Sequence, residues 1–301
     1  MRLVIALGGN ALLQRGEPLD AATQRRNVAS AVVQGIAPLA NAHELVITHG
    51  NGPQVGLLAL QASAYRDVPP YPLDLLGAES EGMIGYLIEL ALAGALPQRD
   101  VAALLTLVEV DPADPAFAAP SKPIGPVYPE GEARRLAEKH AWSLVPDGEG
   151  WRRAVASPLP RRIRELNPIR TLLQSGAIVI CGGGGGIPVA ANPTGLAGIE
   201  AVIDKDRVAA LLAEELAADF LLILTDVPGV WPRWPARNEP VMDRATPKVL
   251  ESWRFEAGSM GPKVEAACRF VSRTGRRAGI GRIEDAARIL AGQTGTAILP
   301  D

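Results

Sequence analysis

Lysines are the residues of this chain whose placement most suggests chemistry. Only five of its 30 basic residues are lysine, and the others are arginine. Three of the five, Lys122, Lys205 and Lys263, lie in tight segments flanked by glycine, proline or aspartate. A lysine ammonium is a compact, movable charge, whereas an arginine guanidinium is a planar fork. Ammonium groups at such positions are typical of sites that compensate the negative charge of a transferring phosphoryl group.

Two aspartates flank one of these lysines, in Asp204-Lys205-Asp206, directly before an expected helix that ends near 218. Either aspartate could simply cap this helix by accepting hydrogen bonds from its first N–H groups. A cap does not account for the lysine between them. We therefore expect one of the aspartates to hold the Lys205 ammonium in position for use on a phosphate.

Glycine-rich turns supply a second set of candidates. Gly8-Gly9-Asn10 follows an apolar run at 3–7, and Gly50-Asn51-Gly52-Pro53 follows another at 45–48. Because glycine has no Cβ, backbone N–H groups can approach an anion closely at such turns. Pro53 also suits the first turn of a helix, whose N-terminus favours negative charge. Both segments are ordinary turn formers as well. The indication of an anion-binding site therefore comes from their occurrence at two strand ends.

Five consecutive glycines, 182–186, follow the apolar segment 177–181. A tight turn needs one or two glycines, and each further one increases the entropy lost on folding. The run therefore indicates backbone that wraps closely around a ligand. It lacks the lysine of a P-loop and leads to Ile187-Pro188 rather than to a helix, so it matches neither a P-loop nor a dinucleotide-binding fingerprint.

The expected secondary structure around these residues alternates between strand and helix. Helical patterns lie at about 23–41, 53–66, 74–94, 204–218, 259–274 and 283–291. The alternation predicts an α/β fold, a three-layer αβα sandwich around a mostly parallel central sheet. In such sheets ligands bind beyond the carboxyl ends of the strands. The three glycine segments, and the turn at Asp226 after the apolar run 220–225, should therefore open onto one edge.

Residues 111–160 differ from their surroundings, since they contain nine prolines and two tryptophans. We expect a single domain spanning 1–301, from which this segment protrudes as a small lid subdomain of hairpins with a helix near 130–140. Lys122 belongs to the segment. A plain surface loop is the alternative, although long loops in compact domains are usually functional or disordered.

Composition argues against several classes of function. The formal net charge is −3, and no basic stretch is interleaved with aromatic residues, so nucleic-acid binding has little support. The N-terminal apolar run is too short for a signal peptide, and no stretch approaches the roughly 20 apolar residues that span a membrane. Cys181 and Cys268 lie in apolar settings and are expected to be buried thiols in a reducing compartment. We therefore expect a cytoplasmic protein.

Taken in order, these motifs resemble those of the carbamate kinases, within the amino-acid kinase superfamily, and the resemblance runs from end to end. It is carried by the segments 6–11, 48–56, 75–86, 122–126, 182–188, 202–206, 224–230 and 258–264. Many other superfamily members, such as acetylglutamate kinases, have a lysine two residues before the first glycine pair. This chain has Ala6 there, and Lys122 is similar to the lysine that carbamate kinases use instead.

The resemblance implies a homodimer and a reversible, Mg²⁺-dependent phosphoryl transfer between ATP and carbamate that gives ADP and carbamoyl phosphate. The N-terminal half would bind the phosphoryl acceptor, and the C-terminal half the nucleotide. The matching residues would be Lys122, Lys205, Lys263 and Asp206 for catalysis, Gly8, Gly9, Asn10, Gly50, Asn51, Gly182 and Gly183 for substrate binding, and Asp204, Thr225, Asp226, Val230, Met260 and Lys263 for nucleotide binding. No protein metal ligand is expected, because nucleotide phosphates would hold most of the Mg²⁺ coordination.

Two segments depart from the family pattern. The segment 230–235 is shorter than in most family members and lacks the tyrosine that they carry there. At 279–281 this chain has Gly-Ile-Gly, where family members more often have a turn from a strand to Thr or Ser. The adenine pocket is therefore unassigned in detail. Two alternatives stay open: a superfamily member that acts on another carboxylate or a phosphate monoester, and a non-catalytic nucleotide sensor. Carbamate is already an anionic nucleophile, so no general base is required, and His49 is expected to stabilise its turn.

Overall fold

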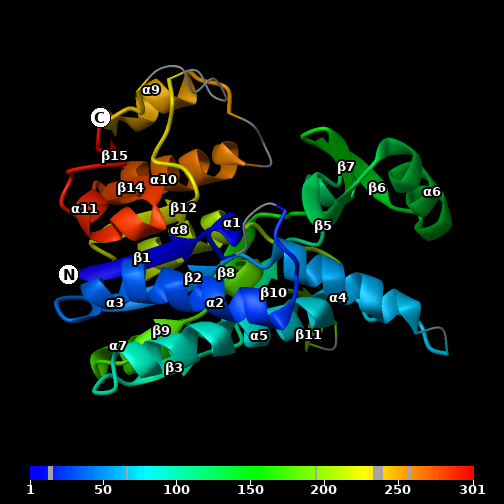
Figure 1. Ribbon diagram of the computed structural model, residues 1–301, viewed down its shortest axis with the longest axis horizontal. Coiled ribbons are helices and arrows are strands. Elements are labelled where there is room, and N and C mark those ends of the chain that lie inside the picture. Colours follow the sequence, from blue (N-terminus) through cyan, green and yellow to red (C-terminus); the bar gives the residue numbers. More distant parts are fainter. Residues whose placement is uncertain (13–15, 66, 194, 233–239, 256–258) are drawn as a thin grey trace.

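The computed structural model describes residues 1–12, 16–65, 67–193, 195–232, 240–255 and 259–301. At its centre is an eight-stranded sheet (Figure 1). In spatial order its strands are β13 Arg244–Ala245, β15 Thr296–Ile298, β14 Arg277–Arg282, β12 Phe220–Thr225, β1 Arg2–Leu7, β2 Glu44–His49, β9 Ile178–Ile180 and β3 Val101–Ala103. All neighbouring strands are parallel except β14 and β15. The prediction of a mostly parallel sheet is confirmed.

The central strands are apolar throughout because both faces of the sheet are covered. On β1, Leu3 and Ile5 belong to one buried cluster, whereas Val4 and Ala6 belong to another. Side chains alternate between the two faces of a strand, so each cluster marks one face. A continuous apolar run is typical of a parallel strand that is buried on both sides. The molecule is therefore a three-layer αβα sandwich, as the sequence predicts.

Helices complete the two outer layers. One face is covered by α2 Ala21–Ala31, α3 Ala37–Ala40, α5 Leu73–Ala95 and α11 Ala286–Leu290, and the other by α7 Leu166–Gln174, α8 Lys205–Glu215 and α10 Met260–Thr274. The remaining helices are α1 Gly9–Leu12, α4 Gly52–Ala64, α6 Glu130–His140 and α9 Pro247–Glu251, with short turns η1 Val32–Ile36, η2 Pro115–Phe117, η3 Gly183–Gly185 and η4 Ile283–Asp285. None of the helices in the described part of the chain combines the length and apolar character that a bilayer crossing needs.

A three-stranded antiparallel sheet protrudes from this body. Its strands, in spatial order, are β5 Lys122–Tyr128, β7 Gly150–Val155 and β6 Ser143–Asp147, and α6 packs on them. Figure 1 shows this unit at one end of the molecule, with both chain termini at the opposite end. The predicted hairpin and the helix at 130–140 are therefore confirmed. Whether the unit moves as a lid stays a prediction.

A second, four-stranded sheet was not expected from the sequence. It consists of β11 Gly195–Gly198, β10 Ile187–Asn192, β4 Leu107–Val110 and β8 Pro160–Ile163. β8 begins at Pro160, so the last residue of the segment 111–160 already belongs to the four-stranded sheet. Its strands are short and come from distant parts of the chain, and only their pairing identifies them as a sheet.

The predicted helix at 23–41 is interrupted. The structure has α2, then the wide turn η1, then α3. Pro38, in the first turn of α3, has no N–H to donate to the preceding turn, so the regular hydrogen-bond ladder cannot continue through this position. Gly35 lies in η1, where a Cβ would be 2.5 Å from the carbonyl oxygen of Ile283, so the absence of a side chain allows close packing on η4.

Candidate active site

A cavity of about 300 Å³ lies at the carboxyl ends of β1, β2 and β12, beside the glycine run that follows β9. Its lining residues are Gly8, Gly9, Gly50, Asn51, Gly52, Pro53, Ser121, Lys122, Pro123, Asp147, Arg152, Ser157, Gly184, Asp204, Lys205, Asp206, Arg207, Thr225, Asp226, Ser259, Pro262 and Lys263. The expectation that the turns after four parallel strands meet at one edge is confirmed. All three lysines singled out in the sequence lie in this lining.

The first two glycine turns are fastened to neighbouring strands. The N–H of Gly8 donates to the carbonyl oxygen of Leu224 at 2.8 Å, and the N–H of Gly50 donates to that of Leu7 at 2.9 Å. A Cβ on Gly50 would lie 2.8 Å from the nitrogen of Gly9, so no side chain fits between the turns. α4 begins at Gly52, and its N-terminus faces the cavity. The side chain of Asn10 lies outside the described part of the structure.

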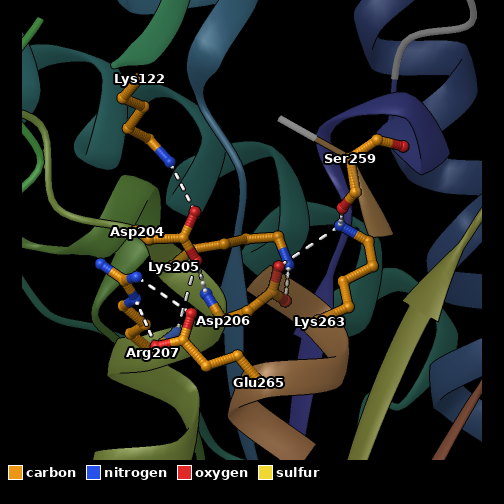
Figure 2. Close-up of polar contacts among 8 residues, drawn as sticks. All are labelled: Lys122, Asp204, Lys205, Asp206, Arg207, Ser259, Lys263 and Glu265. Carbon is orange, nitrogen blue, oxygen red and sulfur yellow. Dashed lines mark hydrogen bonds and ion pairs between the residues drawn. The ribbon is translucent and has the colours of Figure 1, made fainter. Parts of the chain in front are cut away.

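Asp206 joins two of the lysines (Figure 2). One carboxylate oxygen is 2.5 Å from Nζ of Lys205, and the other is 3.3 Å from Nζ of Lys263. The Lys263 ammonium also donates to the carbonyl oxygen of Ser259 at 3.5 Å. The Asp206 side chain is only 3% exposed, so water does little to screen these contacts. A buried carboxylate thus holds two ammonium groups from α8 and α10 at one wall of the cavity.

Asp204 has both of the roles that the sequence left open. Its Oδ1 accepts hydrogen bonds from the N–H groups of Asp206 and Arg207, at 2.9 and 3.4 Å, which caps α8. Its Oδ2 accepts from Nζ of Lys122 at 2.7 Å (Figure 2). Lys122 lies on β5, so this ion pair links the protruding sheet to the N-terminus of α8. Capping and site formation are therefore not exclusive alternatives.

Burial and neighbouring charge shift the pKa values of these groups in different directions. Burial lowers the pKa of Lys205, and the Lys263 ammonium adds to the effect, against the attraction of Asp206. Burial also acts to lower the pKa of Lys263, but Asp206 and Asp204 outweigh it and the pKa is raised. For Asp204, burial opposes ionisation, yet Lys122 and the other two lysines hold its pKa well below the usual range. An anion bound beside Lys205 would favour its charged form.

The glycine run reaches the cavity only at Gly184. Gly182 and Gly183, two residues predicted to bind substrate, do not line it. Their N–H groups donate instead to Oγ1 of Thr106 at 2.8 Å and to Oε1 of Glu81 at 2.9 Å. The structure thus places both residues directly behind the wall that the substrate would meet.

The need for so many glycines is largely internal. The φ angle is positive at four of the five, a region that other residues rarely adopt. A Cβ on Gly183 would collide with the imidazole of His49, and one on Gly184 with the amide of Asn51. The expectation that the whole run wraps around a ligand is therefore wrong. Most of it packs against the protein's own side chains.

Beneath the run lies a polar layer in which sequence reasoning missed Glu81. Burial raises the pKa of Glu81 to about 8, and its second oxygen accepts from the N–H of Thr106 at 3.2 Å. Burial lowers the pKa of His49 to about 4, so its imidazole is neutral, with Nδ1 3.3 Å from the carbonyl oxygen of Gly50. His49 does not line the cavity. Glu81 shares the buried face of α5 with Ile84 and Ile88, a spacing that could have identified it.

The predicted nucleotide residues separate into two groups. Thr225 and Asp226 line the cavity together with Lys263, and Oγ1 of Thr225 donates to Oδ1 of Asp226 at 3.0 Å. Val230 and Met260 are buried in the apolar core and do not line the cavity. Of the divergent segment 230–235, only residues 230–232 are described, so the adenine side stays a prediction.

Further residues of the lining carried no signal in the sequence. Arg152 on β7 and Asp147 on β6 form an ion pair at 3.1 Å and belong to the protruding sheet. Two adjacent arginines, Arg152 and Arg153, must face opposite sides of their strand. Which of them faces the cavity depends on how the protruding sheet docks. Cys181 and Cys268, by contrast, are buried free thiols, as predicted.

Sequence comparison identifies relatives of the whole chain. Residues 1–281 match the model of the amino acid kinase family. A carbamate kinase of Rhizobium meliloti is 53% identical over 302 residues, covering 99% of this chain and 93% of the relative. A carbamate kinase of Haemophilus influenzae is 54% identical over 300 residues, covering 99% and 96%.

Structure comparison agrees over the same length. A carbamate kinase from Giardia lamblia bound to citric acid superposes with a TM-score of 0.92 at 40% identity, and covers 100% of this chain and 98% of the other. The same enzyme bound to AMP-PNP gives a TM-score of 0.88 at 39% identity, with the same coverage. The likeness therefore extends across the central sheet and the segment that carries Lys122.

Proposed function

This chain belongs to the amino acid kinase family and, within it, to the carbamate kinases, and we propose that it transfers a phosphoryl group reversibly between ATP and carbamate. The observation that supports this most directly is the meeting of Lys122, Lys205 and Lys263 around one cavity with the glycine turns of β1 and β2. These lysines come from segments more than 50 residues apart, on three different elements.

The chemistry asks mainly for positioning and charge compensation. In the forward direction a carbamate oxygen attacks the γ-phosphorus of ATP, the bond to the β-phosphate oxygen breaks, and ADP leaves with its electron pair. The nucleophile is already an anion, so no proton has to be removed. The negative charge on the phosphoryl oxygens meets ammonium groups and N–H donors that are already in place, which lowers the barrier. His49, neutral and behind the wall, is not needed as a base.

We assign the two ends of the cavity to the two substrates. The turns at Gly8, Gly9, Gly50 and Asn51 would surround the acceptor, with Lys122 reaching over it from β5. Thr225 and Asp226 would meet the nucleotide, and Lys205 and Lys263, oriented by Asp206, would contact phosphate oxygens between them. We retain Asn10, Gly182, Gly183, Val230 and Met260 as predictions that rest on the family resemblance alone.

The donor groups fit a Mg²⁺ ion that arrives with the nucleotide. In the described part of the chain, no three His, Cys, Asp or Glu side chains form a group able to hold a metal by themselves. Mg²⁺ commonly keeps water and phosphate ligands and needs only one or two carboxylates. Asp226, at the nucleotide end, is the carboxylate we would assign to it. When bound, the ion would neutralise phosphate charge.

A homodimer would explain an apolar surface on α5. Leu75, Met83, Tyr86 and Leu90 on this helix are each at least one third exposed, and Leu105 lies beside Gly82 of the same helix. Exposed patches of this kind often mark interfaces. We expect Leu90→Glu to shift the molar mass in light scattering from dimer to monomer. Val249→Glu, on α9, is the matched control, and a wild-type monomer would overturn the assignment. A cytoplasmic location stays a prediction.

The test of function is ATP formation from ADP, Mg²⁺ and carbamoyl phosphate, with acetyl phosphate as the control donor. Without either donor we expect only background ATP formation. With a donor present, we expect a clear preference for carbamoyl phosphate over acetyl phosphate. A preference for another acyl phosphate or a phosphate monoester would identify a different acceptor. ADP binding without turnover of any donor would identify a nucleotide sensor.

A further inference from the structure

The protruding sheet places an arginine in the cavity beside its lysine. Arg152 lies on β7, next to β5, which carries Lys122. Nη1 of Arg152 donates to Oδ2 of Asp147 at 3.1 Å, and the two side chains are only 16% and 18% exposed. A partly buried carboxylate therefore fixes the orientation of the guanidinium, as Asp204 fixes that of Lys122.

The other end of the guanidinium lies over the start of α4. The atom nearest to a Cβ built on Gly52 is Nη2 of Arg152, at 3.9 Å. Gly52 is the first residue of this 13-residue helix, and both it and Pro53 line the cavity. The first N–H groups of a helix have no partners within the helix and favour anions. Arg152 thus completes a cationic corner whose other side is a helix N-terminus.

We propose that Arg152 binds the anionic acceptor group, the carboxylate of carbamate and the phosphoryl group of carbamoyl phosphate, from the face opposite Lys205 and Lys263. The inference rests on the proposed function and names a residue that the family motifs did not. A guanidinium fork can donate two parallel hydrogen bonds to a carboxylate or phosphate, which an ammonium cannot. Such an arginine would fix the direction of the acceptor as well as compensate its charge.

The next residue along the strand shows that this placement is specific. Arg153 is on the opposite face of β7, where its guanidinium lies 5.1 Å from the ring centroid of Trp142 and 3.7 Å from a carboxylate oxygen of Glu200. It does not line the cavity. The two arginines share a strand, a charge and a comparable burial, and differ in what they face. Arg153 therefore provides a matched control.

The experiment compares Arg152→Lys and Arg152→Met with Arg153→Lys and Arg153→Met. We expect Arg152→Met to lower kcat/KM for carbamoyl phosphate by about 100-fold, and Arg152→Lys by about 10-fold, since lysine keeps the charge but not the fork. The KM for ADP should stay within about twofold. The Arg153 variants should keep both constants within about threefold. These sizes correspond to the usual worth of a charge-assisted hydrogen bond.

A second measurement separates this inference from the proposed function. Thermal-shift titration with carbamoyl phosphate, and with inorganic phosphate as an alternative probe, reports anion binding without turnover. Weaker binding of both anions by Arg152→Met than by Arg153→Met supports the inference, even if the wild-type protein made no ATP. Unchanged anion binding and unchanged kcat/KM in both Arg152 variants would overturn it, while leaving a wild-type kinase activity untouched.

Discussion

The cations of the cavity come from two regions that are anchored in different ways. Lys205 and Lys263 lie on α8 and α10, which pack on the central sheet and contribute to its larger buried cluster. Lys122 and Arg152 lie on β5 and β7 of the protruding sheet, which stands apart from the main body (Figure 1). The first pair shares one carboxylate, that of Asp206. In the second pair, Lys122 contacts Asp204 and Arg152 contacts Asp147.

The protruding sheet meets the main body in a glycine contact. Gly56 of α4 lies so close to Gly125 of β5 that a Cβ on Gly56 would collide with the backbone. Gly125 itself has a φ of +74°, which favours glycine. Under the proposed function, the two regions would serve different substrates. The core would hold the cations that contact the nucleotide phosphates, and the protruding sheet would bring those that contact the acceptor.

The largest expected effect is on the core-anchored pair. Lys205→Ala and Lys263→Ala should each lower kcat by about 10²- to 10⁴-fold, because each removes a preorganised charge from the transferring group. Steady-state ATP formation measures this, and the Tm checks folding. Lys139→Ala and Lys248→Ala, at exposed positions, are the controls and should behave as wild type. A near-wild-type rate for either cavity variant would remove that lysine from the mechanism.

Replacing the lysine of the protruding sheet should act on one substrate only. Lys122→Ala is expected to lower kcat/KM for carbamoyl phosphate by about 10- to 100-fold, since a charge-assisted contact is lost. ADP binding, measured by calorimetry, should change by less than about twofold. Equal losses for both substrates would contradict the division between the two regions.

Disturbing the contact between the regions should mimic the loss of the acceptor-side cations. Gly56→Ala forces α4 and β5 apart and should lower carbamoyl phosphate efficiency by about tenfold, since small displacements of reacting groups are costly. Gly77→Ala, in α5, is the control, because a Cβ there meets no atom within 4 Å. If Gly56→Ala kept full activity, the position of the protruding sheet would not matter for catalysis.

The two roles of Asp204 can be separated by a pair of variants. Asp204→Asn keeps an oxygen that can cap α8 but removes the charge that holds Lys122, so we expect a several-fold loss of activity with little change in Tm. Asp204→Ala removes the cap as well, which should cost about 1 kcal/mol of unfolding free energy in addition. Equal stability of the two variants in denaturant titrations would show that the cap contributes nothing.

The smallest effect concerns the polar layer behind the core-anchored wall. Burial raises the pKa of Glu81 from its ordinary value of 4.5 to about 8, so the folded state holds an extra proton between these pH values and loses stability as pH rises. The pKa of His49 is about 4 against 6.5, so stability rises with pH between these values. The contributions of Glu81 and His49 to the pH dependence of stability therefore oppose one another up to pH 6.5.

Only the Glu81 slope remains above pH 6.5. Stability should therefore fall between about pH 6.5 and 8, by at most about 1.4 kcal/mol per pH unit from this group. Urea titrations across this range should show the decline in the wild-type protein and a flatter curve in Glu81→Gln. The same decline in both proteins would assign it to other groups.

The central sheet and the residues that follow its strands can be predicted from local sequence patterns. Apolar runs such as the one at 220–225 predict strands buried on both faces, and the rule that parallel strands present their carboxyl ends to one edge brings their turns together. The three lysines could be found because lysine is rare in this chain and stands beside turn-forming residues. Local patterns and topology rules suffice for such features.

The pairing partners of the site residues depend on the tertiary structure. Nothing local to Lys122 indicates that it pairs with Asp204, 82 residues away, or that Arg152 rather than Arg153 enters the cavity. The sequence predicts that the glycine run wraps around a ligand, and only its packing on His49 and other side chains shows what excludes a Cβ there. The spacing of residue types along a chain indicates which helix or strand each residue belongs to. Burial, charge pairing and close approach depend on how those elements dock, which is a property of the folded whole.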